Sequence, residues 1–291
     1  MKARLLLVCI LASSVEYTVA QKWSFEAIAI PKTSWISGDF TPPMHNSTED
    51  NPITFSLEAG AAIHYSISPK SSISLGVLYS QQGQEYDTYI YTAAQSAPPG
   101  FTSKFTQTAE KTTSLNYLKI PIQYMHVQPD RNIAFTWVAG LYVAYLLNAT
   151  DRYVYTHHVE NTDLSNGSVS GYDITAEHIT KNRAFESTLT DQQGTRQKTF
   201  ELLQDPFHAF DLGGIFGAGL QFKLSDKLFM PLLLKYQLGF LNIKNMDCKY
   251  IFEYGSTSTP ITYWQLESNY TDLNENYFNA SFGLSVGLIF R

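Results

Sequence analysis

The feature that most constrains this chain is a two-residue alternation of apolar and polar side chains over residues 53–67. Apolar side chains or alanine occupy every odd position from Ile53 to Ile67, and Thr, Ser, Glu, Gly or His occupy most even positions. A helix would place its apolar residues three and four positions apart. The alternation therefore predicts a β-strand with one apolar face and one polar face.

The same alternation recurs, and the predicted strands are residues 23–30, 53–67, 73–79, 118–124, 133–147, 210–222, 228–240 and 278–290. The connections between these eight strands alternate in length. Three are tight turns at 68–71, 128–131 and 225–227, and four are expected loops at about 32–52, 91–113, 148–206 and 243–276. Short turns and long loops in strict alternation are typical of outer-membrane β-barrels, whereas most loops have only about four to six residues.

The first twenty residues have the pattern of a signal peptide. A basic start with Lys2 and Arg4 precedes a short apolar run, and small residues precede Gln21. We therefore expect residues 1–20 to be removed and residues 21–291 to form one barrel domain. Without the leader, Cys248 is the only cysteine, so no internal disulfide is expected.

The membrane as solvent determines the expected topology. After Gln21 no stretch reaches the roughly 18 consecutive apolar residues that a membrane-spanning helix needs. A strand in hydrocarbon must pair its backbone amides, so the first strand is expected to pair with the last. The prediction is an all-β protein: an eight-stranded, antiparallel, up-and-down transmembrane β-barrel in the outer membrane, with short periplasmic turns, long extracellular loops and both termini in the periplasm.

Composition and charge narrow the expected partners. The chain is 44% hydrophobic and 14% aromatic, and it carries a net charge of -6. Because nucleic acid binding needs a concentrated basic face, no nucleic acid partner is expected. The expected partners are outer-membrane lipid on the apolar faces and the barrel assembly machinery during insertion.

Three segments resemble the PorT-like outer-membrane β-barrel family of Gram-negative bacteria: residues 116–124 (NYLKIPIQY), 213–222 and 282–290. The similarity covers the strand framework from about Ile53 onward and does not include the loops. Barrels of this kind commonly end on an aromatic residue, whereas Arg291 follows Phe290 here. The resemblance implies an eight-stranded outer-membrane barrel and, through the member that names the family, a link to protein secretion.

Six charged residues fall on inward-facing positions of the predicted strands: Glu26, Glu58, Lys119, Asp211, Lys223 and Lys235. A barrel of eight strands is only wide enough to be filled by side chains, and a buried charge is costly unless it is paired. We expect these charges to pair across the lumen as a structural network. The alternative is a proton or ion path built from the same residues.

Motifs for catalysis are not found in the sequence, so we expect no catalytic, cofactor or metal site. The seven histidines occur without a Gly-x-Ser-x-Gly or His-Glu-x-x-His pattern, and no motif surrounds Cys248. One alternative is an outer-membrane lipid hydrolase or acyltransferase, which a serine and a histidine within hydrogen-bond reach on the lipid-facing rim would favour. Another is a soluble secreted lipid-binding barrel, whose interior would be apolar.

The longest expected loop is the best candidate for a binding surface, since binding residues concentrate on loops held by a rigid scaffold. The candidate residues are Tyr153, Tyr155, His157, His158 and Tyr172. The expected partner is an extracellular protein or glycan. The role could be in envelope structure, adhesion or secretion assembly, and the sequence does not decide among them.

Overall fold

The computed structural model describes residues 22–37, 47–50, 54–95, 100–128, 132–245, 248–254, 257–262 and 277–291. The expected signal peptide, residues 1–20, lies outside them. Within these ranges the chain is all-β, without helices. The strands are β1 (Trp23–Ser37), β2 (Ser47–Asp50), β3 (Thr54–Ser68), β4 (Ser71–Gln95), β5 (Phe101–Gln128), β6 (Ile133–Asp163), β7 (Val169–Lys181), β8 (Ala184–Asp191), β9 (Gly194–Glu201), β10 (Phe210–Lys223), β11 (Leu228–Gly239), β12 (Lys249–Tyr254), β13 (Thr257–Thr262) and β14 (Phe278–Phe290).

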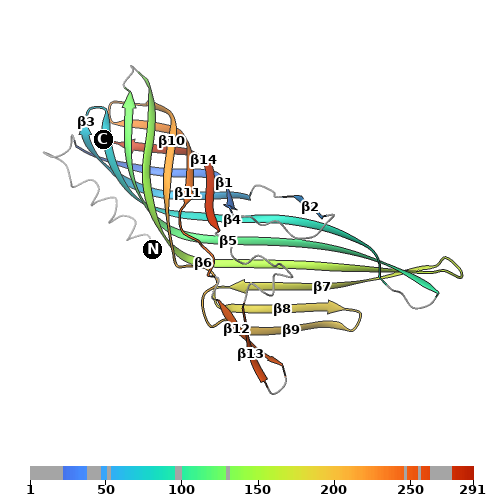
Figure 1. Cartoon of the computed structure of the whole chain (residues 1–291). Helices are drawn as coiled ribbons and strands as arrows, with labels where there is room; N and C mark the ends of the chain where they lie inside the picture. Colours follow the sequence, from blue (N-terminus) through green and yellow to red (C-terminus); the bar gives the residue numbers. More distant parts are fainter. Residues whose placement is uncertain are drawn as a thin grey trace, which may run out of the picture.

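Eight of these strands close into an antiparallel barrel in the order β1, β3, β4, β5, β6, β10, β11 and β14 (Figure 1). The pairing of β14 with β1 completes the ring, with Leu288 opposite Ala27. β6 also pairs with β10, although 46 residues separate the two strands. The predicted fold class is thus confirmed, and so is the pairing of the first and last strands.

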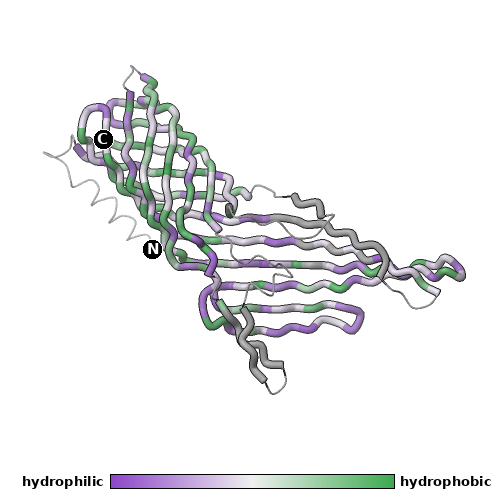
Figure 2. The backbone as a smooth tube through the Cα atoms, in the orientation of Figure 1, coloured by the Kyte–Doolittle hydropathy of each residue, from purple (hydrophilic) through white to green (hydrophobic). Residues whose placement is uncertain are grey.

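The two faces of the barrel wall have opposite chemistry. On β3, Leu57 and Ile63 are 46% and 45% exposed, whereas Glu58 and His64 are only 1% and 2% exposed. Apolar residues therefore cover the outer surface and polar residues point inward. Figure 2 shows hydrophobic residues in green along the strands of the barrel. An outer surface this apolar suits lipid and not water. The arrangement is the reverse of that in a soluble lipid-binding barrel.

Three strands continue far beyond the barrel. β4, β5 and β6 have 25, 28 and 31 residues, whereas β14 has 13. Their outer parts carry a projecting sheet, in which β6 pairs with β7, β7 with β8, and β8 with β9 (Figure 1). At about 3.3 Å per residue, β6 alone is roughly 100 Å long, and about 9–11 residues are enough to cross a membrane.

Much of the sequence that was expected to form loops forms strands instead. Most of residues 91–113 belong to β4 and β5, and most of residues 148–206 belong to β6, β7, β8 and β9. Parts of the other two expected loops are also strands: β1 extends to Ser37, β2 pairs with β4, and β12 and β13 form a hairpin. The physical reason is cross-strand pairing, which orders polar strands that have too few apolar residues to be recognised from their pattern.

The barrel end next to the projecting sheet is filled by an apolar cluster. Leu115, Phe207, Ile243 and Cys248 are buried there, with exposures of 0–2%. Leu202 and Phe207 come from one long connection and Ile243 and Cys248 from the other, so both connections contribute side chains to this cluster. Among the described turns at the opposite end, Pro69 and Lys70 join β3 to β4, and residues 224–227 join β10 to β11.

Cys248 provides a test of this closed end. Its Sγ donates a hydrogen bond to the carbonyl oxygen of Gln204 at 3.1 Å, and burial raises the pKa of the thiol to about 11. The reactive thiolate therefore forms in the folded protein only as the pH approaches that value. At pH 8 we expect iodoacetamide to label the folded protein about a hundredfold more slowly than the urea-unfolded chain. Equal labelling rates would show that the cluster is open.

Candidate functional site

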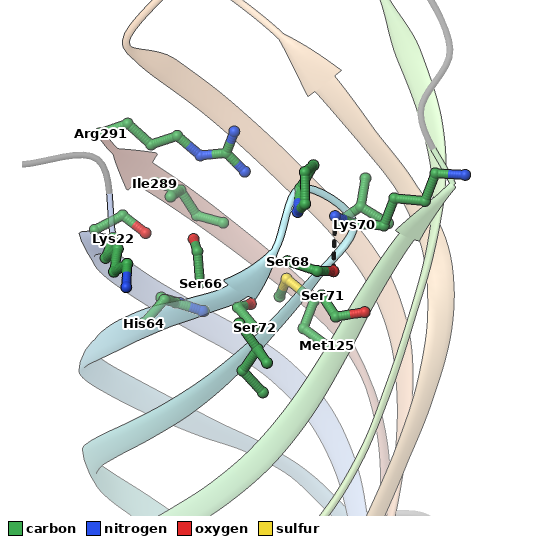
Figure 3. Close-up of a pocket in the computed structure, with 14 residues that line it drawn as sticks. Lys22, His64, Ser66, Ser68, Lys70, Ser71, Ser72, Met125, Ile289 and Arg291 are labelled. Carbon is green, nitrogen blue, oxygen red and sulfur yellow. Dashed lines mark hydrogen bonds between the residues drawn. The ribbon is translucent and has the colours of Figure 1, made fainter.

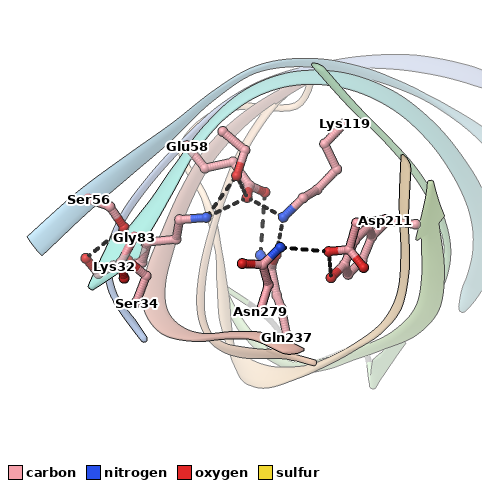
Figure 4. A network of polar contacts seen from close by, with 11 residues as sticks. Lys32, Ser34, Ser56, Glu58, Gly83, Lys119, Asp211, Gln237 and Asn279 are labelled. Atoms are coloured by element: carbon pink, nitrogen blue, oxygen red, sulfur yellow. Dashed lines mark hydrogen bonds and ion pairs between the residues drawn. The ribbon is translucent and has the colours of Figure 1, made fainter. Parts of the chain in front are cut away.

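A layer of polar side chains crosses the lumen, and every strand of the barrel contributes to it (Figure 4). Its members are Lys32 on β1, Glu58 on β3, Ser80 on β4, Tyr117 and Lys119 on β5, Tyr142 on β6, Asp211 on β10, Gln237 on β11 and Asn279 on β14. All of these residues are buried. The alternation of each strand points polar residues inward, which is why residues so distant in sequence meet.

Glu58 is the centre of one half of the layer. Its Oε2 accepts hydrogen bonds from the Nζ atoms of Lys32 at 3.1 Å and Lys119 at 3.0 Å, and from the hydroxyl of Ser80 at 2.9 Å. Lys119 also donates to Oε1 of Gln237 at 2.6 Å. The carboxylate is therefore shared by two cations, in a site from which water is excluded.

Asp211 is the centre of the other half. Its Oδ2 accepts hydrogen bonds from the hydroxyl of Tyr142 at 3.1 Å and from Nδ2 of Asn279 at 3.0 Å. The Lys119 ammonium lies 4.4 Å from the centre of the Tyr142 ring, which connects the two halves. The layer contains two lysines and two carboxylates, so its formal charges balance.

A second set of charges lies nearer the end of the barrel that holds the short turns. His64 Nε2 is 2.8 Å from Oε2 of Glu26, and both residues are buried. Lys235 is buried as well and interacts electrostatically with Glu26 and Glu58. With these groups, the buried charges described so far are three lysines and three carboxylates.

The six charges that the sequence pattern places in the lumen divide into two groups. Glu26, Glu58, Lys119, Asp211 and Lys235 are buried inside the barrel. Lys223 is different: it is exposed at the end of β10 and forms an ion pair with Asp226 at 2.7 Å. Lys223 shares the face of β10 that carries the buried Gln221, but the strand ends there, so its side chain reaches the solvent at the turn and does not join the buried network.

Sequence reasoning also missed Lys32, which it assigned to a loop. β1 continues through Pro31 to Ser37, and Lys32 lies on the same inward face as Glu26. Extending the two-residue period across Pro31 would have found it. Gln237 and Asn279 were also missed, because neutral amides on an inward face do not stand out until their partners are known.

Buried side chains from every strand of the barrel meet in this lumen, and a barrel of eight strands is only wide enough to be filled by side chains. We therefore expect the purified protein, reconstituted in a planar lipid bilayer, to give no stepwise conductance above the bare membrane. An ion path through the polar layer predicts discrete conductance steps instead, and these would contradict the structural role. Glu58→Ala, which opens space in the layer, is a useful comparison because any conductance it gains would locate the barrier.

The predicted binding residues lie on the projecting sheet, on two different faces. Tyr153, His157 and Val159 are separated by even numbers of residues on β6, so they point to the same face. Tyr172 lies opposite Val159 in the pairing of β6 with β7 and therefore shares that face. His158 lies on the other face, where its Nδ1 is 2.6 Å from Oδ1 of Asp173. Tyr155 is part of β6, but the position of its side chain lies outside what the structure describes.

The face with Tyr153 also carries His178, which lies directly opposite Tyr153 and stacks on Phe185 with ring centroids 5.6 Å apart. Burial lowers the pKa of both His157 and His178, which favours the neutral form of both imidazoles. The opposite face carries charged pairs such as Arg152 with Glu177, 2.7 Å apart. The face with Tyr153 thus carries aromatic rings and imidazoles together with charged groups, among them Lys111, which lies opposite Tyr153 and pairs with Asp151.

A serine and a histidine meet on the outer surface of the barrel, near the short turns. Ser71 Oγ is 3.1 Å from His126 Nδ1 and 2.7 Å from the hydroxyl of Tyr124. The His126 ring also lies 5.8 Å from that of Trp137. In the described part of the chain, no acidic side chain pairs with His126 to orient it, as a serine hydrolase would need.

Within the described residues, no group of three His, Cys, Asp or Glu side chains is arranged to hold a metal ion. In the same part of the chain, no helix is long and apolar enough to span a membrane.

Comparison with known proteins identifies a family. The model of the family described as "Outer membrane protein beta-barrel domain" matches residues 31–245. The search of curated proteins returns no match.

Several solved outer-membrane proteins resemble the chain at low identity. The outer membrane protease OmpT from Escherichia coli is 9% identical, with a TM-score of 0.41, and the match covers 96% of this chain and 99% of that one. Ail, the attachment invasion locus protein of Yersinia pestis, is 8% identical, with a TM-score of 0.27, over 92% of this chain and 99% of Ail. The translocator domain of the autotransporter NalP from Neisseria meningitidis is 9% identical, with a TM-score of 0.21, over 100% of this chain and 95% of the domain. Similarity this low transfers no activity to this chain.

Proposed function

This chain belongs to the outer membrane protein β-barrel domain family, and from that premise we propose that it is a non-enzymatic, non-conducting scaffold that binds a partner outside the cell. The observation that carries the proposal is the projecting sheet. A barrel that only had to cross the membrane would not need β5 and β6 to be twice as long as β14. The filled lumen supports the same proposal, since it argues against transport.

The orientation is part of the proposal. The short turns and both ends of the described barrel, near Trp23 and Phe290, lie at one end, and the projecting sheet lies at the other. Outer-membrane barrels have short turns on the periplasmic side and long connections outside. We therefore place both termini in the periplasm and the sheet outside the cell.

The binding face that we propose contains Tyr153, His157 and Tyr172. Tyrosine offers a large contact area and a hydroxyl at low entropic cost, and neutral imidazoles can donate or accept hydrogen bonds. This chemistry suits a protein or glycan surface. The opposite face carries solvent-exposed pairs, such as Arg152 with Glu177 and His158 with Asp173, which are typical of a solvated surface.

The test uses two matched triple variants. Tyr153→Ser, His157→Ser and Tyr172→Ser together remove the proposed face, and His158→Ser, Asp173→Ser and Glu177→Ser together alter the opposite face. Binding is measured on glycan arrays and by cross-linking on intact cells. We expect the first variant to reduce binding at least tenfold and the second to change it less than twofold, and equal effects would contradict the proposal.

A lipid hydrolase is the second candidate, because the hydrogen bond between Ser71 and His126 is the feature that would favour it. The two side chains lie on the outer surface of the barrel, at the end where the short turns are. The assay measures fatty acid release from phosphatidylethanolamine by the purified protein and by Ser71→Ala. The scaffold proposal expects release at the background level for both proteins. Fatty acid release that depends on Ser71 would contradict the scaffold proposal and support the hydrolase.

The finer assignment to the PorT-like group is a proposal too. It rests on the likeness of residues 116–124, 213–222 and 282–290 to that group, and it implies a role in protein secretion. A deletion strain with an unchanged set of secreted proteins would argue against it and leave adhesion or envelope structure as the role of the scaffold.

A further inference from the structure

A cavity of about 350 Å³ opens at the end of the barrel that holds the short turns (Figure 3). It lies inside the ring, between the β3–β4 turn and the end of β14. We name this cavity the vestibule. Its size is in the range of small-molecule sites, and the polar layer described above separates it from the projecting sheet.

Cations and hydroxyl groups line the vestibule, and no acidic side chain does. Lys22, Lys70 and Arg291 are the cations, and five serines contribute to the lining, including Ser66 and Ser72. Figure 3 shows Lys22 and Arg291 on one side and Lys70 on the turn at the other side, where its ammonium extends away from the centre. Rotation of its flexible four-carbon stem can bring this charge inward.

Arg291 is the strongest indication that the vestibule receives an anion. Its guanidinium lies 4.4 Å from the centre of the Phe229 ring, and within the described residues it has no carboxylate partner. The nearby cation Lys223 differs, because it pairs with Asp226. A guanidinium that lies over an aromatic ring and has no side-chain carboxylate partner in the described part of the chain attracts a counterion from solution.

The floor of the vestibule is His64, whose Nε2 is bonded to Glu26 beneath it. Glu26 is thereby engaged on the far side of the imidazole ring. Serine hydroxyls around the wall can donate hydrogen bonds to oxygen atoms of a ligand. Several donors and more than one cation suit a phosphate dianion with three free oxygens better than a singly charged carboxylate.

We propose that the vestibule binds a small phosphate-bearing molecule, held by Arg291 and Lys22 and by hydrogen bonds from serines such as Ser66. Most of the lining, including His64, Ser66 and Ile289, lies on the inner face of the barrel. The proposed ligand is therefore a soluble molecule and not a membrane lipid. In the proposed orientation it comes from the periplasm.

The test is calorimetric titration of the full chain, refolded in an uncharged detergent, with glycerol 3-phosphate and with inorganic phosphate. We expect Arg291→Gln to weaken binding about tenfold or more, because a charge-assisted hydrogen bond is lost. The matched control is Lys223→Gln, which removes the same charge from the same rim outside the vestibule. We expect it to change the affinity less than twofold.

A second variant keeps the proposal testable if Arg291→Gln fails to fold. Ser66→Phe fills the vestibule without changing its charge, and heat-modifiable gel migration reports whether each variant has folded. Folded Ser66→Phe is expected to lose binding. Retained binding in this variant, equal weakening by Lys223→Gln, or no binding to the unaltered chain would overturn the proposal. Binding of phosphatidylglycerol in mixed micelles but of neither soluble phosphate would overturn it as well.

Discussion

Replacing Glu58 by glutamine is expected to lower the free energy of unfolding by about 3–5 kcal/mol, because the change leaves Lys32 and Lys119 buried without their shared counter-charge. The glutamine has nearly the same shape and can still accept a hydrogen bond. The packing is therefore unchanged, and the loss of stability measures the effect of removing the negative charge. Both ammonium groups lie within 3.1 Å of the carboxylate, and the three side chains are almost completely buried.

Urea titration of the protein in lipid vesicles, followed by tryptophan fluorescence and gel migration, measures this effect. The matched control is Lys223→Gln, which breaks the solvent-exposed pair with Asp226 and is expected to leave the unfolding midpoint unchanged. A loss below about 1 kcal/mol for Glu58→Gln would mean that water reaches the polar layer.

The second large effect is expected for Leu141→Arg. Leu141 is 56% exposed on the outer face of β6, in the middle of the apolar band. An arginine on the lipid face near the bilayer midplane costs about 2–4 kcal/mol in a transmembrane barrel. The same vesicle titration measures the loss.

Leu164→Arg is its matched control. Leu164 is 63% exposed and lies just beyond the end of β6, at the tip of the projecting sheet. Water surrounds an arginine at that position, so we expect little change in stability. Similar losses for both variants would show that lipid does not surround Leu141.

The barrel could be predicted from sequence because the membrane imposes a simple rule. A strand such as residues 53–67 must present apolar side chains to lipid and must pair on both edges, so alternation and closure follow together. The same rule does not apply to β7, β8 and β9. These strands lie outside the barrel, and their backbone groups could bond to water as well as to neighbouring strands, so their pairing depends on contacts that no local pattern reveals.

The candidate sites were predicted less completely. Glu58 and Lys119 could be placed in one lumen because both lie on inward positions, but Lys32 could not, because the strand was expected to end at Ile30. The face shared by Tyr153 and Tyr172 depends on the register between β6 and β7. Register is set by pairing, and a slip of one residue moves a side chain to the opposite face.

The central claim is that the apolar side of each barrel strand faces lipid and the polar side faces a filled lumen. Electron paramagnetic resonance tests it directly, with single spin labels at each position from Leu118 to Tyr124 in a Cys248→Ala chain reconstituted in vesicles. Oxygen, which dissolves in lipid, is expected to reach labels at Leu118, Ile120, Ile122 and Tyr124 readily and labels at the three intervening positions poorly. The reverse pattern, or equal access at all seven positions, would contradict the account.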